Sequence, residues 1–205
     1  DAVLATRPNL LQVACFDTSF HHDIPRMARM TALPRALTES GIRRYGFHGL
    51  SYEYIMEALR KDGVNTGAER IIIAHLGNGA SMAAIRHDHP IETTMGFSTI
   101  AGLPMGTRSG DLDPGILLYL KQEEGMTADE IFELLYSQGG LLGISGLSRN
   151  MQDLLDSRED TAREAVDYFC YQARLHLARL TGALGGLDRV VFTGGIGENS
   201  AGVRG

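Results

Sequence analysis

Cysteine is scarce in this sequence, and long apolar runs are missing. The two cysteines, Cys15 and Cys170, are separated by most of the 205 residues and form no CxxC pair. This distribution is unlike a secreted disulfide scaffold or a cysteine-rich metal site. No run of about 18 apolar residues is present to cross a bilayer, and residues 1–10 lack the basic and apolar regions of a secretory signal. We therefore expect a protein of the reducing cytoplasm without a membrane span.

Basic residues are outnumbered by acidic ones and are not clustered. Nineteen Lys and Arg against 25 Asp and Glu give a net charge of −6, and the longest basic runs are the pairs at 43–44 and 60–61. A nucleic-acid backbone needs a continuous basic surface to neutralise it, so nucleic acid is not expected as a main partner. The seven histidines include no HExxH pattern and no cysteine-assisted spacing, so no metal ligands are predicted.

Glycine, in contrast, is abundant, at 25 of 205 residues. Much of the excess lies in three short loops: His75–Gly79 (HLGNG), Gly106–Gly110 (GTRSG) and Gly194–Gly197 (GGIG). Glycine lets backbone N–H groups approach an anion closely, and a following helix N-terminus adds a favourable dipole. Each loop alone is more typical of a plain turn or helix start, but three together favour a phosphate ligand. None of them fits a Walker A or GxGxxG pattern.

Apolar patterning predicts an α/β fold with a mixed sheet. Strands are expected at Gln12–Phe16, Arg70–Ala74, Ser81–Arg86 and Arg189–Thr193, the middle two joined as a hairpin through an Asn-Gly turn. Helices are expected at Tyr52–Lys61, from Asp113 and Pro114 to Gln122, from the capping box at Thr127 to Tyr136, from near Ser148, and from about Thr161 to Leu184.

Three polar residues in or near these loops could carry chemistry. Asp17 follows the first predicted strand, where a helix N-cap or an Asx turn is the structural alternative. A lone histidine such as His48 is more often a hydrogen-bonded structural residue than a catalyst. Arg108 is harder to explain structurally, because a guanidinium in a glycine-bordered loop needs an anionic partner. That partner is either Asp111 or a phosphoryl group.

Six segments in succession resemble the signatures of the acetate kinase family, and they occur in the family's order. They are Phe16–His21 (FDTSFH), Arg43–Ser51 (RRYGFHGLS), His75–Ser81 (HLGNGAS), the stretch 93–115 (TTMGF and GLPMGTRSGDLDPG), Gly139–Gly146 (GGLLGISG) and Phe192–Ser200 (FTGGIGENS). The resemblance covers the chain from about Cys15 to its end. Six long motifs in register are far more specific than any single glycine loop.

The resemblance implies the RNase H-like, actin-like ATPase fold, shared by acetate and sugar kinases, heat-shock ATPases and actin. In that fold a mixed sheet is flanked by helices, and two domains close over a nucleotide. Residues 1–20 would be the end of the first domain and the hinge, and residues 21–205 the second, nucleotide-binding domain. We expect both domains to be truncated and the 205-residue fragment to lack parts at both ends.

The resemblance also implies roles for individual residues. Asp17 matches the family's active-site aspartate, where organising a metal or orienting the site is favoured over acting as a base, because acetate is already ionised. His48 and Arg108 match the two transition-state stabilisers, and Phe47 is expected in the acyl pocket. The expected ATP or ADP contacts are His75, Leu76, Gly77, Asn78, Gly79, Asn150, Met151, Gln152, Gly195, Ile196, Gly197, Glu198 and Asn199. Ligands of Mg²⁺ are expected mainly outside these 205 residues.

The implied activity is reversible phosphoryl transfer from ATP to acetate by direct in-line attack, in a homodimeric enzyme. The alternatives are a propionate or butyrate kinase of the same family and a nucleotide-binding fragment without turnover. Departures from the family pattern affect the choice among these alternatives. Asn150 and Gln152 stand where the family commonly has charged residues, and Phe97–Thr99 lacks a common proline, whereas Tyr52, which stands where a histidine is common, is expected to have no consequence. Nucleotide preference and acyl chain length are therefore left open.

Overall fold

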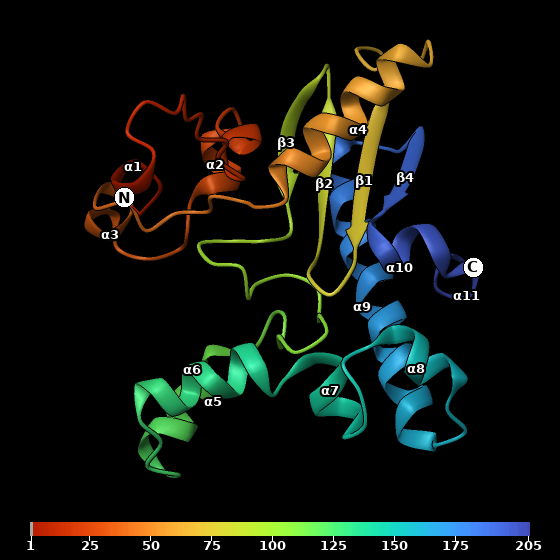
Figure 1. Cartoon of the computed structure of the whole chain (residues 1–205). Helices are drawn as coiled ribbons and strands as arrows, with labels where there is room; N and C mark the ends of the chain where they lie inside the picture. Colours follow the sequence, from red (N-terminus) through yellow and green to blue (C-terminus); the bar gives the residue numbers. More distant parts are fainter. Residues whose placement is uncertain (1) are drawn as a thin grey trace.

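The centre of the molecule is a four-stranded mixed sheet with the strand order β3-β2-β1-β4 (Figure 1). The structure is a computed structural model that describes residues 2–205. The strands are β1 (Arg70–Leu76), β2 (Ala80–Arg86), β3 (His89–Thr93) and β4 (Arg189–Thr193). The pairs β1–β2 and β2–β3 are antiparallel, and β4 is parallel to β1. The predicted hairpin of β1 and β2 is confirmed, whereas β3, a short edge strand containing Pro90, was not predicted.

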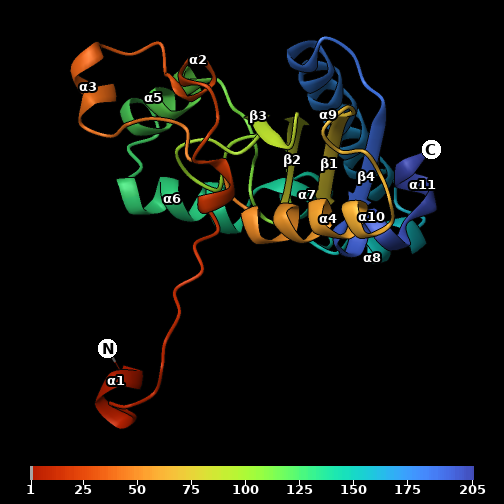
Figure 2. The ribbon, with the colours of Figure 1, turned by 90° about the horizontal axis from the view of Figure 1, so that it is seen from above.

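Both faces of the two central strands, β1 and β2, are buried. Alternate side chains of a strand point to opposite faces, so a strand between two covering layers is apolar throughout. In β1, Ile72, Ala74 and Leu76 pack in the main core with the long helix α9 (Asp160–Leu184), while Ile71 and Ile73 pack with α4 (Gly49–Lys61). Figures 1 and 2 show α4 and α9 on opposite sides of the sheet.

The remaining helices are short. They are α1 (Ala2–Thr6), the 3₁₀ turn η1 (Ser19–His21), α2 (Arg26–Arg29), α3 (Arg35–Glu39), α5 (Pro114–Gln122), α6 (Ala128–Ser137), α7 (Gly140–Ser145), α8 (Met151–Asp156), α10 (Gly194–Asn199) and α11 (Ala201–Arg204). The predicted caps are confirmed, because the Asp113 carboxylate accepts from Gly115 N–H and Thr127 forms its capping box with Glu130. None of the helices in residues 2–205 combines the length and apolar character needed to span a membrane.

The predicted strand at Gln12–Phe16 is wrong. Residues 10–16 have no regular structure, and the side chains of Leu11 and Val13 are 87% and 79% exposed. Figure 2 shows this segment leading away from the sheet, with α1 at its end. A strand is stabilised by its neighbour, and no strand within residues 2–205 pairs with this segment. An apolar run alone therefore predicted a strand that has no partner here.

Candidate active site

Asp17 caps the start of α4. Its carboxylate accepts hydrogen bonds from the N–H groups of His48 at 2.8 Å and Leu50 at 3.4 Å, and its carbonyl accepts from Gly49 N–H at 2.9 Å. The first N–H groups of a helix have no intrahelical partner, and the positive end of the helix dipole favours a carboxylate. The structure thus gives Asp17 a capping function, supplied from a distant segment, which fixes the backbone at His48.

His48 has a left-handed backbone conformation, with φ 59° and ψ 23°. This conformation is uncommon for a residue with a side chain and occurs often at functional sites. The imidazole stacks on that of His75, with ring centroids 4.3 Å apart, and its Nδ1 is 2.8 Å from Ser81 Oγ. Burial, together with the neighbouring His75, lowers the pKa of His48 to about 4. His48 is therefore a neutral imidazole at pH 7.

His75, at the end of β1, is arranged in the same way. Its Nδ1 lies 2.9 Å from the hydroxyl of Ser51 on α4, and burial lowers its pKa. The Nδ1 atoms of both imidazoles are thus engaged by serine hydroxyls. Neither Nε2 has a hydrogen-bond partner within residues 2–205. Two neutral imidazoles therefore each present a free Nε2.

Arg108 lies in a closed loop. The ends of this loop are joined by Gly102 N–H donating to the Asp111 carboxylate at 2.8 Å and Asp111 N–H donating to Gly102 O at 2.9 Å. Arg108 donates to Thr99 O at 3.3 Å, and no carboxylate of the described chain lies within 4.0 Å of its guanidinium. The predicted alternative, a pairing with Asp111, is therefore wrong. The half-buried guanidinium is free to meet an anion.

The glycine turn between β1 and β2 brings His48 and Arg108 together. A methyl group placed on Gly79 would lie 3.2 Å from His48 Nε2 and 3.7 Å from an Arg108 guanidinium nitrogen. Gly106 N–H donates to Asn78 O at 3.0 Å, which ties the Arg108 loop to the same turn. His48 Nε2 and an Arg108 guanidinium nitrogen therefore both lie close to Gly79. Two nitrogens placed in this way can both donate hydrogen bonds to one anion.

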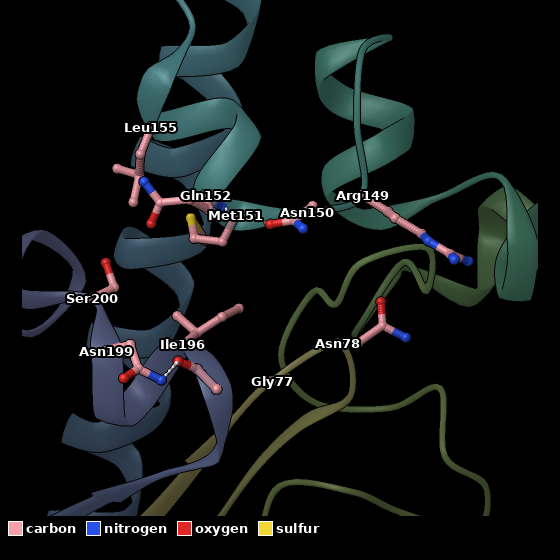
Figure 3. Close-up of a pocket in the computed structure, with 11 residues that line it drawn as sticks. Gly77, Asn78, Arg149, Asn150, Met151, Gln152, Leu155, Ile196, Asn199 and Ser200 are labelled. Carbon is pink, nitrogen blue, oxygen red and sulfur yellow. Dashed lines mark hydrogen bonds between the residues drawn. The ribbon is translucent and has the colours of Figure 1, made fainter.

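A cleft of about 480 Å³ adjoins this turn at Gly77 and Asn78 (Figure 3). Eight of the predicted nucleotide contacts line it: Gly77, Asn78, Asn150, Met151, Gln152, Gly195, Ile196 and Asn199. Three further lining residues, Arg149, Leu155 and Ser200, were not predicted from the sequence. They flank the predicted segments by one to three positions, so extending each segment by a helical turn would have included them. Arg149 is the only charged side chain among the lining residues.

Five predicted nucleotide contacts do not line the cleft. His75 and Gly79 face the His48 side of the turn, as described above. Leu76 is buried in the main core, and Gly197 is buried where a methyl group would lie 3.6 Å from Leu76 Cβ. The Glu198 carboxylate accepts from Thr193 and from Gly194 N–H, each at 3.2 Å, and so holds the start of α10. Leu76, Gly197 and Glu198 are thus engaged in packing and capping, and their expected contacts with a nucleotide stay predictions.

The wall of the cleft at α8 is formed by amides with local partners. The Asn150 side chain accepts from Gln152 N–H at 2.9 Å and caps α8, while Gln152 Nε2 donates to the Asp156 carboxylate at 3.0 Å. Met151 is buried between them, with 4% of its surface exposed. Figure 3 shows this wall facing Ile196 and Asn199 across the cleft. The cleft thus offers apolar contacts bordered by amide groups.

The acyl-pocket prediction for Phe47 is not tested by this geometry. Phe47 is half-buried against the main core, and its carbonyl accepts from His21 Nε2 at 2.9 Å. It lies outside the cleft. In residues 2–205 no three His, Cys, Asp or Glu side chains are grouped so that they could hold a metal ion.

The sequence matches the Acetokinase family over residues 1–205. An acetate kinase from Rhodopseudomonas palustris (strain TIE-1) is 53% identical over 205 residues, which are 100% of this chain and 52% of the relative. One from Methylocella silvestris is 52% identical over 197 residues, covering 96% of this chain and 49% of the relative. The chain spans about half the length of the curated relatives it matches.

Solved structures give the same result and confirm the predicted fold. Porphyromonas gingivalis acetate kinase superposes with a TM-score of 0.93 at 39% identity, covering 99% of this chain and 52% of that one. A propionate kinase from Francisella tularensis superposes with a TM-score of 0.92 at 38% identity, covering 98% and 53%. Because the family match extends over every residue and relatives share half of its sequence, the chain belongs to the acetokinase family.

Proposed function

We propose that this chain forms the nucleotide-binding half of an acetate kinase, which transfers the γ-phosphoryl group of ATP to acetate and catalyses the reverse reaction. The observation that carries the proposal is the pairing of His48 and Arg108 beside Gly79, with no carboxylate near the guanidinium. In this proposal residues 1–20 are the end of a first domain and the hinge, and residues 21–205 are the second domain. The exposure of residues 10–16 outside the sheet supports that division.

Phosphoryl transfer to a carboxylate requires little covalent help from the protein. Acetate is already ionised at neutral pH, so attack in line on the γ-phosphorus needs no general base. Negative charge on the three equatorial oxygens must be stabilised while the attacking oxygen approaches. The Arg108 guanidinium can donate to two of these oxygens, and His48 Nε2 can donate to one. Asp17 acts as a positioning residue, because it holds the N–H groups of His48 and Leu50.

The cleft is the proposed site of the adenosine. Met151, Leu155 and Ile196 offer apolar surface for a flat base, and the amides of Asn150 and Gln152 can bond its polar edge. The turn links this cleft to the phosphoryl site, since Gly77 lines the cleft and Gly79 adjoins His48 and Arg108. A nucleotide in the cleft would therefore extend its phosphates along the turn.

Magnesium, the homodimer and a cytoplasmic location complete the proposal. Mg²⁺ bound to ATP would neutralise phosphate charge. It prefers several oxygen ligands in octahedral geometry, and the described residues contain no cluster of carboxylates that fits this requirement. The Asp17 carboxylate is engaged by the backbone N–H groups of His48 and Leu50. We therefore assign no step to a metal bound by these residues.

The test is a chimera in which these 205 residues replace the matching residues of the Rhodopseudomonas palustris acetate kinase. We expect ADP formation that depends on acetate, and ATP binding without acetate-dependent turnover for the 205-residue chain alone. ADP formation at an equal rate without any carboxylic acid would contradict the proposal and indicate an ATPase. A chimera that is folded and binds ATP but has no turnover would support the alternative of a nucleotide-binding fragment.

The second candidate is a propionate or butyrate kinase, favoured by the superposition on the Francisella tularensis propionate kinase. Specificity constants of the chimera for acetate, propionate and butyrate distinguish the candidates. One methylene in an apolar pocket contributes about 1 to 3 kcal/mol of discrimination. A preference for acetate by about tenfold or more supports the first proposal, and the reverse order supports the second.

A further inference from the structure

Beneath His48 lies a buried row of hydrogen-bonding groups. Tyr52 from α4 contacts the Ser81 hydroxyl of β2 through its own hydroxyl, and Ser81 Oγ lies 2.8 Å from His48 Nδ1. Tyr52 and Ser81 are both 0% exposed. Water therefore cannot supply partners for these hydroxyl groups, and their hydrogens must be placed within the row itself.

Counting hydrogens leaves one satisfactory arrangement. Within residues 2–205 the Tyr52 hydroxyl has only Ser81 as a partner, and the Ser81 hydroxyl has only Tyr52 and His48. If Nδ1 of His48 carried its proton, it would donate to Ser81, and either the Ser81 or the Tyr52 hydrogen would have no acceptor. A buried donor without an acceptor is strongly disfavoured. If Tyr52 donates to Ser81 and Ser81 donates to His48 Nδ1, every hydrogen is accepted.

We propose that Ser81, held by Tyr52, fixes His48 as the tautomer that carries its proton on Nε2. Ser81 is then a positioning residue for the nitrogen that faces the ligand. This inference rests on the proposed function, because it concerns how His48 meets a phosphoryl group.

The tautomer matters because of what Nε2 faces. This atom adjoins Gly79, and an Arg108 guanidinium nitrogen adjoins the same glycine. A neutral imidazole protonated on Nε2 donates a hydrogen bond to an anion placed there, whereas the other tautomer would present a lone pair and repel it. A doubly protonated imidazole would also donate from Nε2, but it is not the main form at pH 7, because burial lowers the pKa of His48 to about 4. The His75 ring stacked on His48 and the Arg108 guanidinium also oppose a second positive charge.

The tautomer is measurable by NMR on the 205-residue chain labelled with ¹⁵N-histidine. Long-range proton–nitrogen correlations at pH 7 distinguish protonated from unprotonated ring nitrogens, and the His48→Gln variant identifies the His48 signals. We expect the parent to show an unprotonated Nδ1 and a protonated Nε2 at their limiting shifts. A protonated Nδ1, or averaged shifts for both nitrogens, would overturn the proposal from the parent protein alone.

Two variants separate the roles of the hydroxyls. The double variant Ser81→Ala/Tyr52→Phe removes both groups and leaves no orphaned donor, so it should fold while the His48 shifts move toward an average of the two tautomers. Tyr52→Phe alone is the matched control, since Ser81 can still donate to Nδ1, and the parent shifts should be retained. Limiting shifts that persist in the folded double variant would contradict the proposal. None of these spectra needs turnover, so an inactive chimera would count against the proposed function without touching this inference.

Discussion

The two sides of the glycine turn are built in different ways. On the His48 side, the left-handed histidine, its buried serine partner and an unpaired Arg108 depend on contacts between distant segments. On the cleft side, Asn150 and Gln152 are exposed, and their side chains hydrogen-bond to residues of α8. The first side is fixed by tertiary packing, so changes there should affect chemistry and stability together. The cleft side is fixed by local contacts, so changes there should alter ligand preference with little loss of unfolding free energy.

The largest effect is expected for Arg108→Ala in the chimera. If the guanidinium stabilises charge on the transferring phosphoryl group, kcat should fall about a hundredfold or more, while KM for ATP changes little. Lysine should restore little, because a point charge cannot donate to two oxygens in a fixed geometry. Arg163→Ala, at an exposed ion pair with Asp160, is the matched control and should leave kcat unchanged. A loss in Arg108→Ala of less than about tenfold, or about 1.4 kcal/mol, would remove this residue from the mechanism.

Gly79→Ala tests how closely His48 and Arg108 approach the turn. The added methyl group would press on His48 Nε2 at 3.2 Å, so we expect a loss of unfolding free energy of about 1 to 3 kcal/mol and a lower kcat. Gly182→Ala in α9 is the matched control, because a methyl group there meets nothing within 4 Å. It should stabilise the chain by about 0.5 to 1 kcal/mol. Equal stability changes for the two variants in urea unfolding would contradict the described packing.

Asp17→Ala tests the cap of α4. Loss of the acceptor for the His48 and Leu50 N–H groups should lower the unfolding free energy by about 1 to 2 kcal/mol. Asp17→Asn retains an acceptor without the charge and should lose less. Denaturant unfolding of the 205-residue chain measures both. If Asp17→Ala were as stable as the parent, Asp17 would have no capping function.

Acid sensitivity follows from the neutral state of His48. Its pKa is about 4 in the folded chain, below the ordinary value of 6.5, so the unfolded chain binds a proton there between these two pH values and the folded chain does not. Stability is therefore lost as the pH falls from about 6.5 to 4. His21, His75 and His176, whose pKa values are also lowered by burial, add to the loss. His48→Gln should make unfolding midpoints less dependent on pH over this interval, and an unchanged dependence would contradict the account.

The smallest effect is expected on the cleft side. Asn150→Asp with Gln152→Arg restores the charges common in the family and keeps a residue that caps α8. We expect the unfolding free energy to change by less than about 0.5 kcal/mol and the Kd for ADP, measured by calorimetry, to change less than about tenfold, because exposed charges contribute little. A larger change in stability would show that this wall is not locally determined.

The sequence predicted the features that local signals encode. The hairpin, the Asp113 and Thr127 caps and the long α9 each depend on residues close in sequence, and all were confirmed. The strand at Gln12–Phe16 was wrong because pairing depends on a partner that the pattern does not show. The structural alternative for Arg108, a pairing with Asp111, is not formed, and a backbone N–H, that of Gly102, engages the carboxylate instead.

The candidate site was predicted by motif resemblance, not by periodicity. His48 and Arg108 come together through the turn at Gly79, and no local signal encodes that contact between distant segments. The same limit applies to Leu76, Gly197 and Glu198, whose placement at the ligand stays a prediction. Leu76 and Gly197 are buried, and the exposed Glu198 carboxylate accepts from Thr193 and from Gly194 N–H, contacts that the motifs do not show.

Hydrogen–deuterium exchange of the 205-residue chain, with and without ATP, tests most directly whether the turn joins a nucleotide cleft to the phosphoryl site. We expect ATP to slow exchange in peptides covering residues 75–79, 106–110, 149–152 and 194–200, with little change in the exposed segment 2–16. The Arg108→Ala variant should retain protection at 149–152 and 194–200 and lose it at 106–110. Protection absent from the cleft segments, or confined to regions away from the turn, would contradict the account.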